Sequence, residues 1–172
     1  MLWIKAIKGF CSGVDLLNEW TCKIFSWLVV PLMLIVFFDV TLRYVFNSPT
    51  IWAWDINLQL LGGLTALGAG YALLTNAHIG VDIIVEQLSS RKRVMVEFII
   101  YLLFIFSVGV FLWQTTLGVW ESVLIGERYG SYWSPPVYPV KIAMFLGVLL
   151  LWLQGITKFL RSILIIKEGG KP

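Results

Sequence analysis

YALLTNAHIGVDIIVEQLSSRKR, residues 71–93, is the one long polar interruption in an otherwise apolar sequence of 172 residues. It holds the only histidine, His78, and the densest basic cluster, Arg91-Lys92-Arg93. On each side of it lie two apolar stretches joined by a short loop rich in Pro and Trp. The sequence therefore divides into two halves of similar design.

The composition indicates a membrane protein. With 59% apolar residues, 13% charged residues and a mean hydropathy of +0.85, the chain is too hydrophobic for an ordinary soluble domain. Four runs, 24–38, 56–77, 98–120 and 142–157, contain no Asp, Glu, Lys or Arg. A membrane-spanning helix needs about 20 mostly apolar residues. We predict an all-α integral membrane protein with one domain, residues 1–172, and four transmembrane helices in two hairpins, at 21–46, 52–75, 94–120 and 137–161.

Two further segments have the pattern of amphipathic helices that lie in the membrane interface. In residues 1–20, apolar side chains recur every three or four positions, opposite a face with Lys and acidic residues, and residues 78–92 follow the same pattern. For residues 1–20 the alternative is a simple extension of the first span. The residues expected to anchor these helices at the inner surface are Trp3, Lys5, Lys8, Phe10, His78, Asp82, Arg91, Lys92 and Arg93.

The basic residues predict that both termini face the cytoplasm. In that orientation Arg43, Arg128 and Lys141 lie on the outer side, and the other ten of the 13 Lys and Arg residues lie inside. The net charge of +3 then reflects topology and does not indicate a nucleic-acid partner. Cys11 and Cys22 fall on the reducing side, so we expect no structural disulfide.

Three ionisable residues are expected to lie together just inside the outer surface. Asp39 and Arg43 are four apart and share a helix face, and Asp55 lies about one turn into the second span at a similar depth. Such groups are costly within a membrane and rarely face lipid. We favour a structural role for the cluster, since the cation would keep the acids ionised. A proton or cation site is the alternative.

The second span carries small residues at four-residue spacing, Gly62, Ala66 and Gly70. Small residues let helix backbones approach closely, which drives helix association inside membranes. The pattern therefore predicts a tight packing face. It leaves open whether the partner helix belongs to this chain or to another subunit.

The sequence offers little chemistry for catalysis. With one histidine, it contains no pattern for a nucleophilic triad, a metal site or bis-histidine haem, and His78 and Asp82 are close enough only to hydrogen-bond each other. The middles of the spans are continuous and apolar, unlike the interrupted helices that bind ions and substrates in secondary carriers. We predict that the chain is not an enzyme, binds no cofactor, and is a scaffold or accessory subunit.

Several ordered motifs resemble one family. FDVTLRYVFNSP at 38–49, WAWD at 52–55, GAGYAL at 68–73, HIGVD at 78–82, GSYWSPPVYP at 130–139 and LWLQ at 151–154 are similar to the small, DctQ-like membrane subunit of TRAP (tripartite ATP-independent periplasmic) transporters. The resemblance covers residues 24–160, nearly all of the apolar part of the chain.

This resemblance implies a set of partners in the bacterial inner membrane. Such subunits pair with a large membrane subunit that holds the Na⁺ and substrate sites and moves as an elevator, while a periplasmic binding protein delivers an organic acid anion. The small subunit would enlarge the static scaffold and hold no transport site. Its outer loops, including Trp52, Glu127 and Arg128, are possible contacts of the binding protein or simply solvated residues. The alternative function is a self-sufficient, homodimeric, proton-coupled four-helix exporter that uses Asp39.

Overall fold

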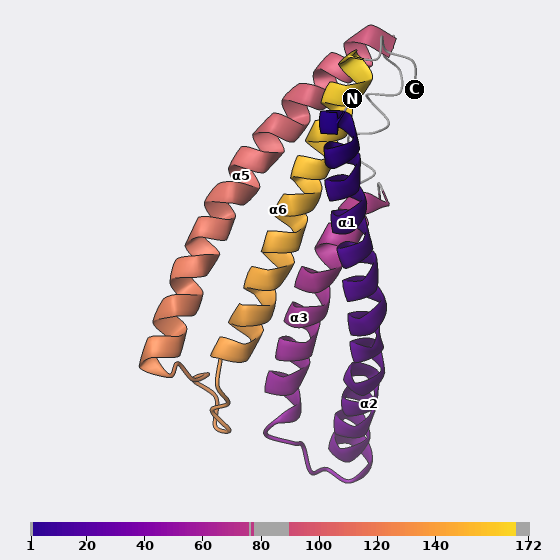
Figure 1. The fold of residues 1–172 in the computed structure, drawn as a ribbon. Helices are drawn as coiled ribbons and strands as arrows, with labels where there is room; N and C mark the ends of the chain where they lie inside the picture. The colour runs from indigo at the N-terminus through magenta and orange to yellow at the C-terminus, as the bar shows by residue number, and fades with distance from the viewer. Residues whose placement is uncertain (1, 76, 78–89, 168–172) are drawn as a thin grey trace.

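The computed structural model describes residues 2–75, 77 and 90–167 (Figure 1). Within these residues the chain is built from helices. For residues 2, 3, 90–95, 97 and 165–167 only the backbone is described. Four helical stretches are long and apolar enough to cross a membrane, at Ile4–Val45, Ala53–Leu74, Phe98–Ile125 and Tyr138–Leu164. The prediction of an all-α protein with four such helices is confirmed for these residues.

The first quarter of the chain is one nearly continuous helical rod. Helix α1 runs over Leu2–Phe25, a 3-10 turn, η1, covers Ser26–Leu28, and α2 follows at Val29–Val45. Pro31 explains the position of the turn, because it lacks the N–H that would bind the Trp27 carbonyl and its ring crowds that carbonyl. The predicted boundary between an interfacial helix at 1–20 and a span starting at 21 is therefore not observed. Whether residues 1–20 lie in the membrane interface or extend the first span stays a prediction.

Of the remaining helices, α3 covers Ala53–Leu74, α5 covers Ser90–Ile125, and α6 covers Tyr138–Lys167. Helix α3 is two residues shorter than the predicted span 52–75, and α5 and α6 are longer than the spans predicted for them. The 36 residues of α5 make it about 54 Å long at 1.5 Å per residue, which exceeds the roughly 30 Å hydrocarbon thickness. The predicted interfacial helix at 78–92 lies mostly outside the described residues, and its last part, 90–92, already belongs to α5.

The helices lie side by side in the order α5, α6, α3, α2, and α1 runs along α6 and α3 (Figure 1). Helix α6 is central, since it packs against α5, α3 and α1. The beginning of α1 and the end of α6 lie at one end of the molecule, called here the terminal end. The connections 46–52 and 126–137 lie at the opposite end, called here the loop end (Figure 1).

The small-residue face of α3 packs inside this chain. A Cβ added at Gly62 would lie 3.2 Å from Val140 Cγ2 of α6, and one added at Gly70 would lie 2.0 Å from Asn18 Oδ1 of α1. Gly70 is buried and Gly62 is half-buried. The tight packing face that the spacing predicts is thus shared with α6 and α1, which answers the question that the sequence left open.

The closest approach of two backbones involves a glycine of α6. A Cβ at Gly147 would lie 2.3 Å from the Ala66 carbonyl oxygen and 2.9 Å from the Leu67 nitrogen. Because these are backbone atoms, no side-chain rotation could relieve the overlap. Gly147 and the α3 stripe therefore set the distance between α3 and α6 at the middle of the bundle.

Candidate functional site

The structure places Arg43 beside Asp39, as the four-residue spacing predicts. Arg43 Nη2 donates to Asp39 Oδ2 at 2.9 Å, and Asp39 Oδ1 accepts from the backbone nitrogen and Oγ1 of Thr50, at 3.2 and 2.5 Å. The Asp39 side chain is only 15% exposed. The two hydrogen bonds from Thr50 fasten the connection 46–52 to α2, and the Arg43 bond lies within α2, so Asp39 is occupied within its own hairpin.

Asp55 does not join this pair. It is buried, and its Oδ2 accepts a hydrogen bond of 2.5 Å from Ser131 Oγ, 76 positions further along the chain. Asp55 lies in the first turn of α3, where the helix dipole favours a carboxylate. The predicted cluster of Asp39, Arg43 and Asp55 is therefore split, because Asp55 points to the second half of the chain instead of the first.

Ser131 belongs to a compact connection that we call the loop cap, residues 126–137. Its two arms are joined by hydrogen bonds of 2.9 Å from Tyr129 N to the Pro135 carbonyl and from Val137 N to the Glu127 carbonyl. Gln59 of α3 also donates to the cap, at the Pro136 carbonyl, over 3.1 Å. The cap is thus a folded element that is attached to the beginning of α3 at two points.

Removing the Asp55 carboxylate should loosen the loop cap. In Asp55→Ala we expect the amides of Tyr129 and Val137 to exchange with deuterium about tenfold faster, because a buried hydrogen bond to a charged group is lost. Hydrogen exchange measured by mass spectrometry over 126–137 would test this. Glu121→Ala, an exposed acid at the end of α5, is the matched control. Unchanged exchange in Asp55→Ala would show that the Ser131 contact does not hold the cap.

A second charged pair joins the loop cap to α6. Lys141 Nζ donates to Glu127 Oε2, and both side chains are about one-third exposed, at 31% and 35%. Lys141 lowers the pKa of the Glu127 carboxyl below its ordinary value of 4.5. The pair joins the loop cap to the first turn of α6. It therefore stabilises the same loop that Asp55 holds through Ser131.

This pKa shift predicts a pH dependence for stability. A carboxyl whose pKa is lowered in the folded state stabilises it above the unfolded value, here 4.5, and this stabilisation is lost as the pH falls through the lowered pKa. The unfolding temperature of Glu127→Gln should therefore lie slightly below that of the wild type at neutral pH, and the gap should close below pH 4.5. Thermal melts of both proteins across this range would check the sign. A gap that widens on acidification would contradict the assignment.

The residues proposed as contacts of a second protein differ in their availability. The Trp52 ring is stacked on Phe38, with ring centroids 6.3 Å apart, and Glu127 is paired with Lys141. Arg128 is exposed and donates one hydrogen bond, 3.3 Å long, to the Ser134 carbonyl. Of these three residues, Arg128 is the one with an exposed charge that is not paired with a carboxylate among the described residues.

A polar network that was not predicted from the sequence joins α1 to α6. Asn18 Nδ2 donates to Gln154 Oε1 at 2.8 Å, Gln154 Nε2 donates to Asp15 Oδ1 at 2.9 Å, and Arg161 is paired with Asp15. Asn18 and Gln154 are fully buried. The signal was present in the spacing, since Asp15 and Asn18 share one face of α1, and Gln154 and Arg161, seven apart, share one face of α6.

This network explains why α1 packs on the bundle. The buried face of α1 consists of Cys11, Val14 and Asn18, whereas Phe10, a predicted anchor, is about half exposed. The predicted polar face supplies Asp15 to α6, and Asn18, which was not assigned to that face, adds a second contact. Burying Asp15 and the Asn18 amide nitrogen is tolerable because each finds a partner on α6, whereas Asn18 Oδ1 has no hydrogen-bond partner among the described residues.

The other predicted anchors are only partly described. Lys5, Lys8 and Phe10 are exposed on α1 near the terminal end. Trp3 lies in α1, and Arg91, Lys92 and Arg93 lie in α5, with only their backbones described, while His78 and Asp82 lie outside the described residues.

No metal centre is found in the part of the chain that the structure describes. Within residues 2–75, 77 and 90–167, no group of three or more His, Cys, Asp or Glu side chains could hold a metal ion. Asn18, Gln154 and Asp55 instead connect one helix to another, or a loop to a helix.

Four membrane-length apolar helices, joined by internal polar contacts, define a multi-pass membrane protein. The family model described as "Tripartite ATP-independent periplasmic transporters, DctQ component" matches residues 32–164, and the chain belongs to this family. The resemblance seen in the motifs is thereby confirmed. The chain is a small permease component of a transporter in the inner membrane, and not an enzyme.

A curated relative carries the same description. The C4-dicarboxylate TRAP transporter small permease protein DctQ of Vibrio cholerae serotype O1 is 24% identical to this chain over 91 residues. The match covers 53% of this chain and 37% of the relative's length. It therefore supports the family and leaves the substrate of this chain to experiment.

Proposed function

We propose that this chain is the scaffold subunit of a sodium-coupled, binding-protein-dependent symporter that imports an organic acid anion. It pairs as a heterodimer with a large membrane subunit, which holds the Na⁺ and substrate sites, and a periplasmic binding protein delivers the solute. The small subunit braces the static part of the large subunit and carries no transport site. The name of the V. cholerae relative makes C4-dicarboxylates the first solutes to test.

The observation that carries this proposal is that the acids of the first two spans are already engaged by internal partners. Asp15 is paired with Arg161, Asp39 with Arg43, and Asp55 accepts from Ser131. A proton- or cation-coupled site built on one of these acids would require that acid to change its partner during the transport cycle. Acids held by fixed donors suit a rigid brace better than a carrier.

The proposed orientation places the terminal end in the cytoplasm and the loop end in the periplasm. The support is the distribution of basic residues, since among the described basic residues only Arg43, Arg128 and Lys141 fall near the loop end. The loop cap would then face the periplasmic binding protein. The exposed surface of that cap is the part of the chain that we propose for that contact.

The alternative, a self-sufficient proton-coupled exporter, is not favoured. It requires Asp39 to release and bind protons, yet Asp39 accepts hydrogen bonds from Arg43 and from two groups of Thr50. Membership of the TRAP small-permease family also describes a component of a larger assembly.

Transport in reconstituted vesicles tests the proposal. We expect uptake of a radiolabelled C4-dicarboxylate only when the chain, the large subunit and the binding protein are combined under an inward Na⁺ gradient. Dissipating the gradient should abolish uptake, and Asp39→Asn should not change the dependence on Na⁺. Uptake by this chain alone that is lost in Asp39→Asn would overturn the scaffold role. A panel of other organic acid anions separates a wrong substrate from a wrong mechanism.

A further inference from the structure

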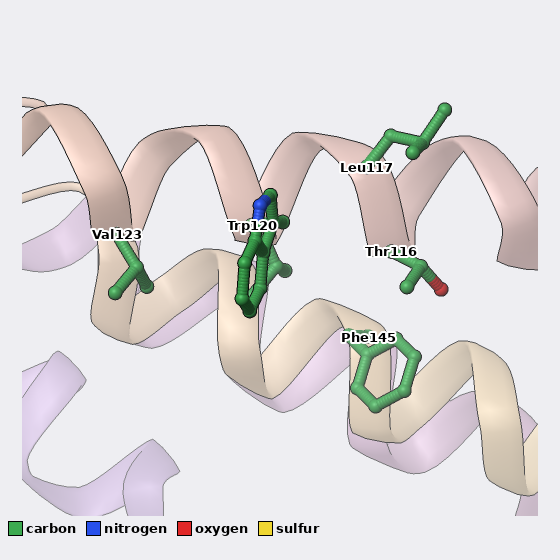
Figure 2. A pocket seen from close by; sticks show the side chains of 6 residues that line it. Thr116, Leu117, Trp120, Val123 and Phe145 are labelled. Atoms are coloured by element: carbon green, nitrogen blue, oxygen red, sulfur yellow. The ribbon is translucent and has the colours of Figure 1, made fainter.

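An apolar groove opens between α5 and α6 near the loop end (Figure 2). Its volume is about 280 Å³, and its lining residues are Thr116, Leu117, Val119, Trp120, Val123 and Phe145. All of them belong to the two membrane-length helices Phe98–Ile125 and Tyr138–Leu164. The groove therefore opens at the depth of the membrane and not in water.

The groove wall offers almost no polar group to a ligand. The hydroxyl of Thr116 donates to the Leu112 carbonyl of its own helix at 2.8 Å and is thereby satisfied. Leu117 and Val123 are each about half exposed. An occupant of this wall must be a hydrocarbon chain or an apolar side chain.

Trp120 adds one polar feature to this apolar wall. Its side chain is 68% exposed, and among the described residues its indole N–H has no hydrogen-bond acceptor. By contrast Trp152, on the same α5–α6 seam, donates to the Ile105 carbonyl at 3.0 Å. The Trp120 N–H is thus free to donate to a group outside the protein, beside a groove that fits an apolar chain.

The position of Trp120 matches the level of lipid esters. It lies five residues before the end of α5 at Ile125, which is about 7.5 Å along the helix, and tryptophans concentrate at this boundary of the membrane. Arg128, three residues beyond that end, is exposed and has no carboxylate partner among the described residues. Its positive charge complements a lipid phosphate.

We propose that the groove binds one acyl chain of a phosphoglyceride from the leaflet at the loop end. The chain lies against Leu117 and Val123, the Trp120 indole donates to a glycerol ester carbonyl, and Arg128 attracts the phosphate. A volume of 280 Å³ is at the small end of ligand pockets, which suits a single chain and is too small for a helix of a partner. The lipid site does not depend on the transport function proposed above.

Native mass spectrometry of the purified full-length chain, titrated with palmitoyl-oleoyl phosphatidylglycerol, tests this proposal. We expect one lipid to remain bound when the detergent is removed. Leu117→Trp, which fills the groove, should abolish that adduct, whereas Leu124→Trp, equally apolar and on an exposed position of α5 outside the groove, should retain it. Trp120→Phe keeps a six-membered aromatic ring and removes the N–H, so it should weaken binding about fivefold.

Two results would overturn the proposal. The first is an adduct that survives in Leu117→Trp, or that disappears equally in Leu124→Trp, since either result would indicate lipid bound elsewhere. The second comes from p-benzoylphenylalanine placed at position Leu117 in cell membranes. Photoactivation should give a phospholipid adduct, and a protein adduct in its place would show that a partner subunit covers the groove.

Discussion

Gly147→Ala is expected to destabilise the packing of α3 against α6 and so to lower the unfolding temperature of the protein. The new Cβ would lie 2.3 Å from the Ala66 carbonyl oxygen and 2.4 Å from its carbon, so the two backbones would have to separate. Overpacking of this kind typically costs about 1–3 kcal/mol and occasionally more, and backbone contacts leave the least room for relaxation. We expect a cost of about 3 kcal/mol, measured as a lower unfolding temperature in detergent.

Other glycines provide the control for this prediction. Gly118 on α5 and Gly68 on α3 have no atom within 4 Å of an added Cβ. Their replacement by Ala should leave the unfolding temperature unchanged or raise it slightly, because Ala forms helices better than Gly. If Gly147→Ala proved as stable as Gly118→Ala, α3 and α6 would have to be further apart than described here.

Gln154→Leu should destabilise the contact of α1 with α6 by about 2–3 kcal/mol. Gln154 is fully buried and links Asn18 to Asp15, so its loss removes two hydrogen bonds and leaves polar groups buried without their partner. We expect earlier thermal unfolding and faster proteolysis of the α1 segment. Gln114→Leu, the same change at an exposed position of α5, should have little effect.

A double replacement distinguishes lost hydrogen bonds from lost packing. In Asn18→Leu/Gln154→Leu both partners of the 2.8 Å contact become apolar, and such pairs are often nearly neutral when their volumes match. Part of the stability lost in Gln154→Leu should therefore return. A double variant that is less stable than the single one by the full additive amount would mean that the two amides act independently.

Local patterns predicted the helices well, and the partners of their side chains poorly. The uncharged runs located all four spans, because a helix long enough for a membrane is recognisable within one stretch of sequence. The Asp39–Arg43 pair followed from four-residue spacing for the same reason. The break in the first rod, at Ser26–Leu28, is also a local feature, because it lies one turn before Pro31 and follows from that residue alone.

The side-chain contacts that join the two halves of the chain could not be predicted from local sequence patterns. Asp55 was expected to join Arg43, a neighbour in sequence, but accepts from Ser131, and Asp15 pairs with Arg161, 146 positions away. Which residues meet depends on how each helix is rotated about its axis. That rotation is set by the fit of whole surfaces, which no single stretch encodes.

By itself, the sequence determined that this protein crosses the membrane with four helices, that its spans offer little chemistry, and which family it resembles. Each of these follows from residue types at short spacings. Only the tertiary structure decided that the small-residue stripe of α3 packs on α6 and α1, that α1 joins the bundle through Asn18 and Asp15, and that the loop cap is tied to α3. Inside the hydrocarbon of a membrane there is no hydrophobic driving force between helices. Which helices pack together is therefore determined by close backbone approach and by buried polar pairs.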